Sequence, residues 1–260
     1  MTDAPVPSPL PLGGVPDHIA DPTQLPVPSS ALAIVAHPDD AEFQCGGTLA
    51  AWAAAGCTIN HLVLTDGSKG TWDASVDPES LARQRRDEQM EAARRLGSTG
   101  KVVVLGHPDG ELQNTLHIRD QVAYWIRTIT PSVVITHDPW KRYQLHPDHR
   151  ATGWLALDGT MAARDPLYFG HHGLGPHRVD AVLLFDADAP DHLVDVSGSI
   201  ERKVEALLAH ESQFVTTHAI DPADPDSRAR FRDRVVENAR AVGRAGGLEM
   251  AEAFKLLDRL

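Results

Sequence analysis

The sequence predicts an α/β protein with a Rossmann-like three-layer sandwich and a mainly parallel β-sheet. Two observations support this prediction. From residue 31 onward, short apolar runs alternate with longer helical patterns, which is typical of right-handed βαβ units. His and Asp residues cluster after the predicted strands, at the edge where ligands bind in open α/β sheets.

The composition limits the partners of this 260-residue chain. Apolar residues make up 42% and charged residues 23%, as in ordinary soluble globular proteins. The formal net charge of −12 argues against nucleic acid and anionic membranes as partners. We find neither a transmembrane run nor a secretory signal pattern. Cys45 and Cys57 flank one predicted helix, so we expect no disulfide framework and a cytoplasmic location.

The first thirty residues differ from the rest of the chain. They hold eight of the nineteen prolines. Proline is excluded from helix interiors and from central strands. We therefore predict an extended arm over residues 1–30, followed by a single domain over residues 31–260.

The first half of the domain repeats a strand–helix pattern. The predicted strands cover residues 31–36, 58–65, 101–105 and 132–136. The predicted helices cover residues 47–55, 78–96 and 118–130. The first strand is expected to be fully buried, because it carries no charge. Pro78 lies near the start of the second helix and Gly97 follows its end, which are the usual boundary signals.

The second half is less regular. A helix is predicted to follow residue 149 and to run to about residue 164. Two further strands are expected over residues 178–185 and 193–196, and two further helices over residues 199–210 and 227–245. No element is predicted after them.

Two His/Asp clusters lie at strand ends. His-Pro-Asp-Asp at residues 37–40 follows the first strand directly, and His-Pro-Asp-His at residues 146–149 follows the fourth strand after a loop. Imidazole nitrogen and carboxylate oxygen are good ligands for Zn²⁺ and Fe²⁺. His37, Asp40 and His149 would supply three ligands and leave one position open for water.

The other polar residues of the clusters are candidates for proton transfer. A bound metal lowers the pKa of its water to about 7, and Asp39 lies in the same turn as two ligands, where it can accept the proton. His146 would stabilise the oxyanion or protonate the leaving group, with Asp148 orienting His146. The alternative interpretation is two solvent-exposed turns. It is weaker for two clusters at one sheet edge than for one.

Two other function classes stay open at this point. Two His and one carboxylate also form the facial triad of non-haem Fe(II) oxygenases. Such oxygenases do not require a base like Asp39, and we would expect an all-β scaffold for them. A non-catalytic binding protein is the second alternative, against which the presence of Asp39 and all three metal ligands argues.

The motifs and their order resemble those of the LmbE/PIG-L family of metal-dependent N-deacetylases. The shared motifs are AHPDD at 36–40, GGTL at 46–49, TDG at 65–67, RxxE at 85–88, LG at 96–97, PDG at 108–110, HPDH at 146–149 and a HESQ segment at 210–213. The match begins at about residue 31, so the proline-rich arm lies outside it.

The resemblance implies a Rossmann-like fold and hydrolysis of an N-acetyl group, usually on an N-acetylglucosamine-type sugar. It implies that His37, Asp40 and His149 bind Zn²⁺, with Fe²⁺ as the alternative in the cell. It further implies that Asp39 is the general base and that His146 assists as the acid or oxyanion partner. The partner would be a small N-acylated sugar or amine. An amidase acting on a thiol conjugate and a homo-oligomer both remain compatible with the resemblance.

The resemblance also implies that Arg85 and Asp109 hold the sugar. A salt bridge on the helix surface or to another element is an alternative role for Arg85, and a simple turn role is an alternative for Asp109. Of the remaining strand-end residues, we assign His137 to the rim of the site. His210 is expected to satisfy a partner in the core.

Two tryptophans in predicted loops complete the candidates. Trp72 and Trp140 lie above the carboxyl edge of the sheet, where they could line a pocket or stack on a sugar.

Overall fold

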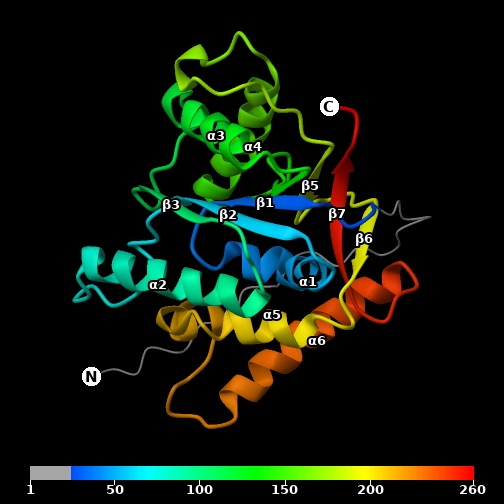
Figure 1. The fold of residues 1–260 in the computed structure, drawn as a ribbon. Coiled ribbons are helices and arrows are strands. Elements are labelled where there is room, and N and C mark those ends of the chain that lie inside the picture. Colours follow the sequence, from blue (N-terminus) through cyan, green and yellow to red (C-terminus); the bar gives the residue numbers. More distant parts are fainter. Residues whose placement is uncertain (1–24) are drawn as a thin grey trace.

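A seven-stranded sheet with helices on both faces forms the part of the chain that this computed structural model describes, residues 25–260 (Figure 1). Most of the predicted N-terminal arm, residues 1–24, lies outside the described residues. The three-layer α/β prediction is confirmed. Among the helices of residues 25–260, none combines the length and apolarity needed to cross a membrane.

The strands are β1 (Ser30–Val35), β2 (Thr58–Thr65), β3 (Val102–His107), β4 (Val133–His137), β5 (Ala181–Phe185), β6 (His192–Asp195) and β7 (Ala251–Leu257). The α-helices are α1 (Asp40–Ala54), α2 (Pro78–Leu96), α3 (Leu116–Ile129), α4 (Pro147–Arg164), α5 (Ile200–Leu207) and α6 (Ser227–Ala245). Three short helical turns are η1 (Gly170–His172), η2 (Glu211–Gln213) and η3 (Phe214–His218).

The strand order is β3-β2-β1-β4-β5-β7-β6. The strands from β3 to β5 pair in parallel, whereas β7 is antiparallel to both β5 and β6. The chain leaves β1 toward β2 on one side and later returns to β4 on the other. The gap between the ends of β1 and β4 is therefore the topological switch point, where open α/β sheets bind their ligands.

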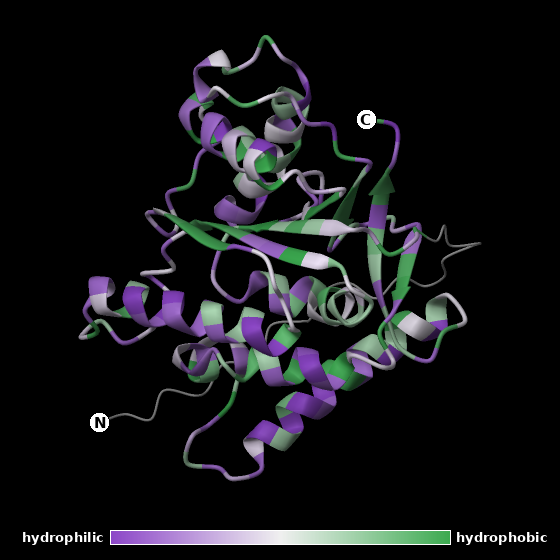
Figure 2. Cartoon of the chain, viewed as in Figure 1, coloured by the Kyte–Doolittle hydropathy of each residue, from purple (hydrophilic) through white to green (hydrophobic). Residues whose placement is uncertain are grey.

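The central strand β1 is buried on both faces. Ala33 and Val35 pack in one hydrophobic cluster with Leu49 of α1, while Leu32 and Ile34 pack in another that holds residues of α3 and α4. Accordingly, α1, α2, α5 and α6 lie on one side of the sheet and α3 and α4 on the other (Figure 1). The central strands are mostly hydrophobic, and the helices carry hydrophilic residues on their outer sides (Figure 2). This two-sided burial explains the uncharged apolar run of the sequence.

Helix α1 begins seven residues earlier than predicted, at Asp40 instead of Gly47. Two helical segments meet at Cys45, whose φ of −141° is not helical. The backbone N–H groups of Gly47 and Thr48 donate to the carboxylate of Glu252, at 3.0 and 2.7 Å, so this side chain caps the second segment. A Cβ at Gly47 would lie only 2.8 Å from the side chain of Val196, which explains the glycine.

Two buried histidines predict a loss of stability in acid. Burial lowers the pKa of His61 and of His218 below their usual value. Below a pH of about 6.5 the unfolded chain takes up protons that these folded side chains do not. The free energy of unfolding therefore decreases as the pH is lowered, by up to about 1.4 kcal/mol per pH unit for each histidine.

Urea unfolding between pH 7.5 and 5.5 tests this prediction. We expect the His61→Gln variant to lose less stability over this range than the wild type, whereas the same change at the exposed His117 should leave the loss unchanged. An equal loss in the wild type and in His61→Gln would contradict the prediction.

Candidate active site

The two predicted His/Asp clusters meet at the carboxyl ends of β1 and β4, which are neighbours in the sheet. Residues 37–40 form the turn between β1 and α1, and residues 146–149 lie at the start of α4. His146 is the N-cap of α4, where its Nδ1 accepts the backbone N–H of Asp148 at 3.3 Å. The prediction that the clusters would meet at this edge is thus confirmed by the geometry.

Asp40 is the acceptor on which the cluster converges. Its Oδ2 accepts the backbone N–H of His37 at 2.8 Å and lies 3.3 Å from His37 Nδ1 and 3.4 Å from His137 Nε2. Its Oδ1 lies 3.3 Å from His149 Nε2. Although burial alone would raise it, the surrounding imidazoles hold the pKa of Asp40 well below its usual value. Asp40 is therefore an ionised, buried carboxylate facing three imidazoles.

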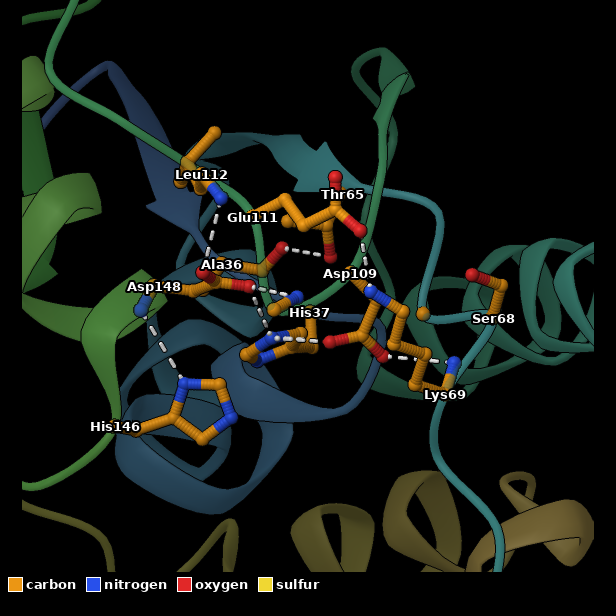
Figure 3. A network of polar contacts seen from close by, with 12 residues as sticks. Ala36, His37, Thr65, Ser68, Lys69, Asp109, Glu111, Leu112, His146 and Asp148 are labelled. Carbon is orange, nitrogen blue, oxygen red and sulfur yellow. Dashed lines mark hydrogen bonds and ion pairs between the residues drawn. The ribbon is translucent and has the colours of Figure 1, made fainter.

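The opposite edge of the His37 ring is held by two other carboxylates (Figure 3). His37 Nε2 lies 3.2 Å from Asp148 Oδ2 and 3.3 Å from Asp109 Oδ1. Asp148 also accepts the backbone N–H groups of Gly110 and Leu112, at 2.7 and 3.1 Å. Although burial alone would lower it, hydrogen bonds to these carboxylates and to Asp40 raise the pKa of His37 well above its usual value. With its Nε2 proton directed at Asp109 and Asp148, the ring can bind a metal ion through Nδ1 once that atom has lost its proton.

The predicted partner of Asp148 was wrong. The Asp148 carboxylate contacts His37, and only its backbone N–H reaches His146. The cause is the first turn of α4, which directs the buried Asp148 side chain toward β1 and the loop after β3. Asp109, predicted to bind substrate, also contacts His37 and accepts the backbone N–H of Lys69 at 3.1 Å. Its role toward substrate stays a prediction.

Asp39 occupies an unusual backbone conformation, with φ 105° and ψ −25°. Its side chain is buried and lies with Oδ2 3.3 Å from Arg85 Nη2. Burial raises the pKa of Asp39 to about 6, and the negative charge of Asp40 adds to this effect against the opposing charge of Arg85. A carboxyl with such a pKa is ionised at neutral pH and still a useful base.

Arg85 is only 3% exposed. Its Nη1 donates to the carbonyl of Gly67 at 3.0 Å, and its Nη2 donates to the carbonyl of Pro38. The guanidinium thus ties the turn at residues 37–40 to the loop after β2. The structure contains one of the alternatives considered for Arg85, namely pairing with another element. Sugar binding by Arg85 stays a prediction.

His137 was assigned to the rim, and this is wrong. It is only 3% exposed, and its ring stacks on His149 with centroids 4.3 Å apart. Burial and the neighbouring His149 lower the pKa of His137 to about 4, so it is neutral. The sequence signal that could have placed His137 in the cluster is its position at the end of β4, beside β1.

Burial also lowers the pKa of His146 below its usual value.

The donor set fits a divalent metal ion. Two groups of donor atoms overlap at His149, namely His37, His146 and His149, and Asp40, His137 and His149, each with atoms within 4.8 Å of one another. The predicted ligands His37, Asp40 and His149 span both groups. An ionised carboxylate with imidazoles suits Zn²⁺ or Fe²⁺. The carboxylates behind His37 Nε2 are the outer partners that metal-binding histidines usually have.

A third His/Asp group, formed by Asp120, His171 and His172, does not fit a metal. Arg127 Nη1 lies 3.2 Å from His172 Nδ1, and a guanidinium can only donate. The proton of His172 is therefore on Nε2, which donates to Asp120 at 2.6 Å. The group has no free lone pair at His172 and instead ties η1 to α3.

A cavity of about 850 Å³ opens beside the cluster. Its lining includes residues of both predicted motifs, among them Asp39, Asp40, His146 and His149. Trp72 and Trp140 are not among its lining residues, and Trp140 packs against Trp154 with ring centroids 4.9 Å apart. Local sequence places these tryptophans near the sheet edge but does not give the direction of their side chains.

Known proteins are similar to this chain in sequence and in fold. Residues 32–159 match the model of the PIG-L family, described as GlcNAc-PI de-N-acetylase. The chain is 37% identical over 186 residues to diacetylchitobiose deacetylase of Thermococcus kodakarensis. The aligned region covers 70% of this chain and 69% of that protein. It is 30% identical over 225 residues to the 1D-myo-inositol 2-acetamido-2-deoxy-alpha-D-glucopyranoside deacetylase of Mycobacteroides abscessus, with coverage of 70% and 80%.

A solved structure agrees with these relatives. N,N′-diacetylchitobiose deacetylase from Pyrococcus horikoshii matches this structure with a TM-score of 0.79 and 30% identity, over 89% of this chain and 84% of that chain. The fold and the site together define a hydrolytic N-deacetylase built on an α/β sheet. The chain belongs to the PIG-L family, also known as the LmbE family.

Proposed function

We propose that this protein hydrolyses the N-acetyl group of a small N-acetylated amino sugar with the help of a Zn²⁺ ion held by His37, Asp40 and His149. The observation that supports this most is the convergence of an ionised, buried Asp40 with neighbouring imidazoles at the switch point of the sheet. Both sequence relatives described above are named for deacetylation of an acetylated sugar.

Each residue around the metal ligands has a role that follows from its contacts. A bound divalent ion would polarise the amide carbonyl and lower the pKa of water. Asp39 accepts the proton of the attacking water, because it is a carboxylate with a raised pKa at the cavity wall. The ring centroid of His146 lies 4.6 Å from that of His37. His146 stabilises the oxyanion or protonates the leaving amine. Asp109 and Asp148 position His37.

Acetate release with defined metals tests the proposal. The chelator-treated protein is incubated with N-acetylglucosamine or N,N′-diacetylchitobiose, with no metal, with Zn²⁺, or with Fe²⁺, each in the absence and in the presence of oxygen. We expect free amine and acetate in equal amounts, only after metal is added, and independent of oxygen. A product that requires oxygen would favour the oxygenase alternative, and no acetate from any acetylated sugar would overturn the proposal.

A further inference from the structure

The backbone of Asp39 needs support from its neighbours. A φ of 105° is rarely adopted by residues other than glycine, and such conformations persist only where surrounding contacts impose them. The backbone N–H of Asp39 donates to Gln89 Oε1 at 3.0 Å. Gln89 lies on α2, far from the turn in sequence, and is completely buried. Arg85 holds the carbonyl of the same peptide group, that of Pro38, and Gln89 holds its N–H.

Gln89 is itself fixed by a second hydrogen bond. Its Nε2 donates to Glu42 Oε1 at 2.8 Å, and Glu42 is fully buried. Because a carboxylate only accepts, the amide nitrogen of Gln89 must face Glu42 and its oxygen must face Asp39. Glu42 Oε2 in turn lies 3.5 Å from Nε2 of His210, which is also fully buried.

The same face of α2 holds the segment that carries His210. Glu88 accepts the backbone N–H and the hydroxyl of Ser212, at 2.9 and 2.6 Å. Contacts between buried side chains thus connect His210 to Glu42 and Glu42 to Gln89, and Gln89 accepts the backbone N–H of Asp39. The hydrogen bonds and ion pairs of the Glu42, Gln89 and His210 side chains go to one another and to the backbone of Asp39, not to the donor groups that fit a metal.

We infer that Gln89 is a positioning residue that keeps the Asp39 backbone left-handed and so aims its carboxylate into the cavity. This inference rests on the proposed role of Asp39 as the base. The requirement at position 89 is for one acceptor toward Asp39 and one donor toward Glu42. Methionine has a similar shape and offers neither, whereas glutamate would oppose the Glu42 carboxylate with a second one.

Three variants test the inference in the Zn²⁺-loaded protein with N,N′-diacetylchitobiose as the probe. Gln89→Met removes both hydrogen bonds. The double variant Glu42→Gln/Gln89→Glu exchanges the two groups, so that an amide at position 42 donates to a carboxylate at 89, which still accepts from Asp39. The matched control is Gln84→Met, which removes a hydrogen bond to Glu88 from an exposed position on the same helix.

For Gln89→Met we expect kcat to fall by about 10- to 100-fold, because small misplacements of a reacting group have effects of this size. KM and zinc content should stay close to those of the wild type. Hydrogen exchange at the Asp39 amide, followed by mass spectrometry, should become faster. The exchanged pair should recover most of kcat and the slow exchange, and Gln84→Met should behave as the wild type.

Wild-type kcat and wild-type amide exchange in Gln89→Met would overturn the inference. A defect that the exchanged pair does not repair would do the same, since Gln89 would then serve packing alone; if Gln89→Met does not fold, the exchanged pair decides. A wild type that releases no acetate would instead refute the proposed function, while amide exchange would still measure whether Gln89 holds Asp39.

Discussion

Asp39→Asn is expected to lower kcat by about 10²- to 10⁴-fold and to leave the bound metal in place, because general-base catalysis is worth this much. Asparagine is nearly the same shape as aspartate and tolerates positive φ better than most residues. Its side-chain oxygen can still accept from Arg85. The variant therefore removes the proton acceptor and little else.

The measurements are kcat for acetate release, zinc content and the thermal midpoint. The matched control is Asp87→Asn, at an exposed position of α2, which should keep full activity. If Asp39→Asn turned over at the wild-type rate with its zinc retained, Asp39 would not be the base.

Asp40→Ala is expected to abolish activity by releasing the metal. Removing only an outer partner of a metal site lowers affinity by about 10- to 100-fold, so loss of a buried, ionised ligand should exceed about 100-fold. The imidazoles of His37, His137 and His149 would also lose the carboxylate that they share. Zinc content after dialysis against a chelator gradient measures the effect, with Asp87→Ala as the control.

The same experiment separates the two overlapping donor groups. His146 belongs to one group and Asp40 to the other. We expect His146→Ala to keep its zinc and to lose turnover. Retention of zinc by Asp40→Ala together with its loss from His146→Ala would show that the imidazole group holds the metal and that the predicted ligand set is wrong.

Elements with local boundary signals were predictable in detail. Helix α2 begins and ends as predicted, because Asp77 caps it by accepting the N–H of Ser80 at 2.9 Å, Pro78 fits its first turn, and Gly97 ends it with φ 85°. Strand β2 also has its predicted bounds. Strand β7 was missed. Its sequence carries Glu252 and Lys255 among small and apolar residues, and its strand conformation depends on antiparallel pairing with β5 and β6.

The sequence by itself determined the parallel α/β order, the two His/Asp motifs and the edge at which they meet, since motif order and strand ends are local properties of the chain. Only the tertiary structure decided which atoms face one another. In it, His137 contacts Asp40, the Asp148 carboxylate contacts His37 instead of His146, and Gln89 accepts the backbone N–H of Asp39. Side-chain direction depends on contacts between elements distant in sequence, and no local pattern encodes it.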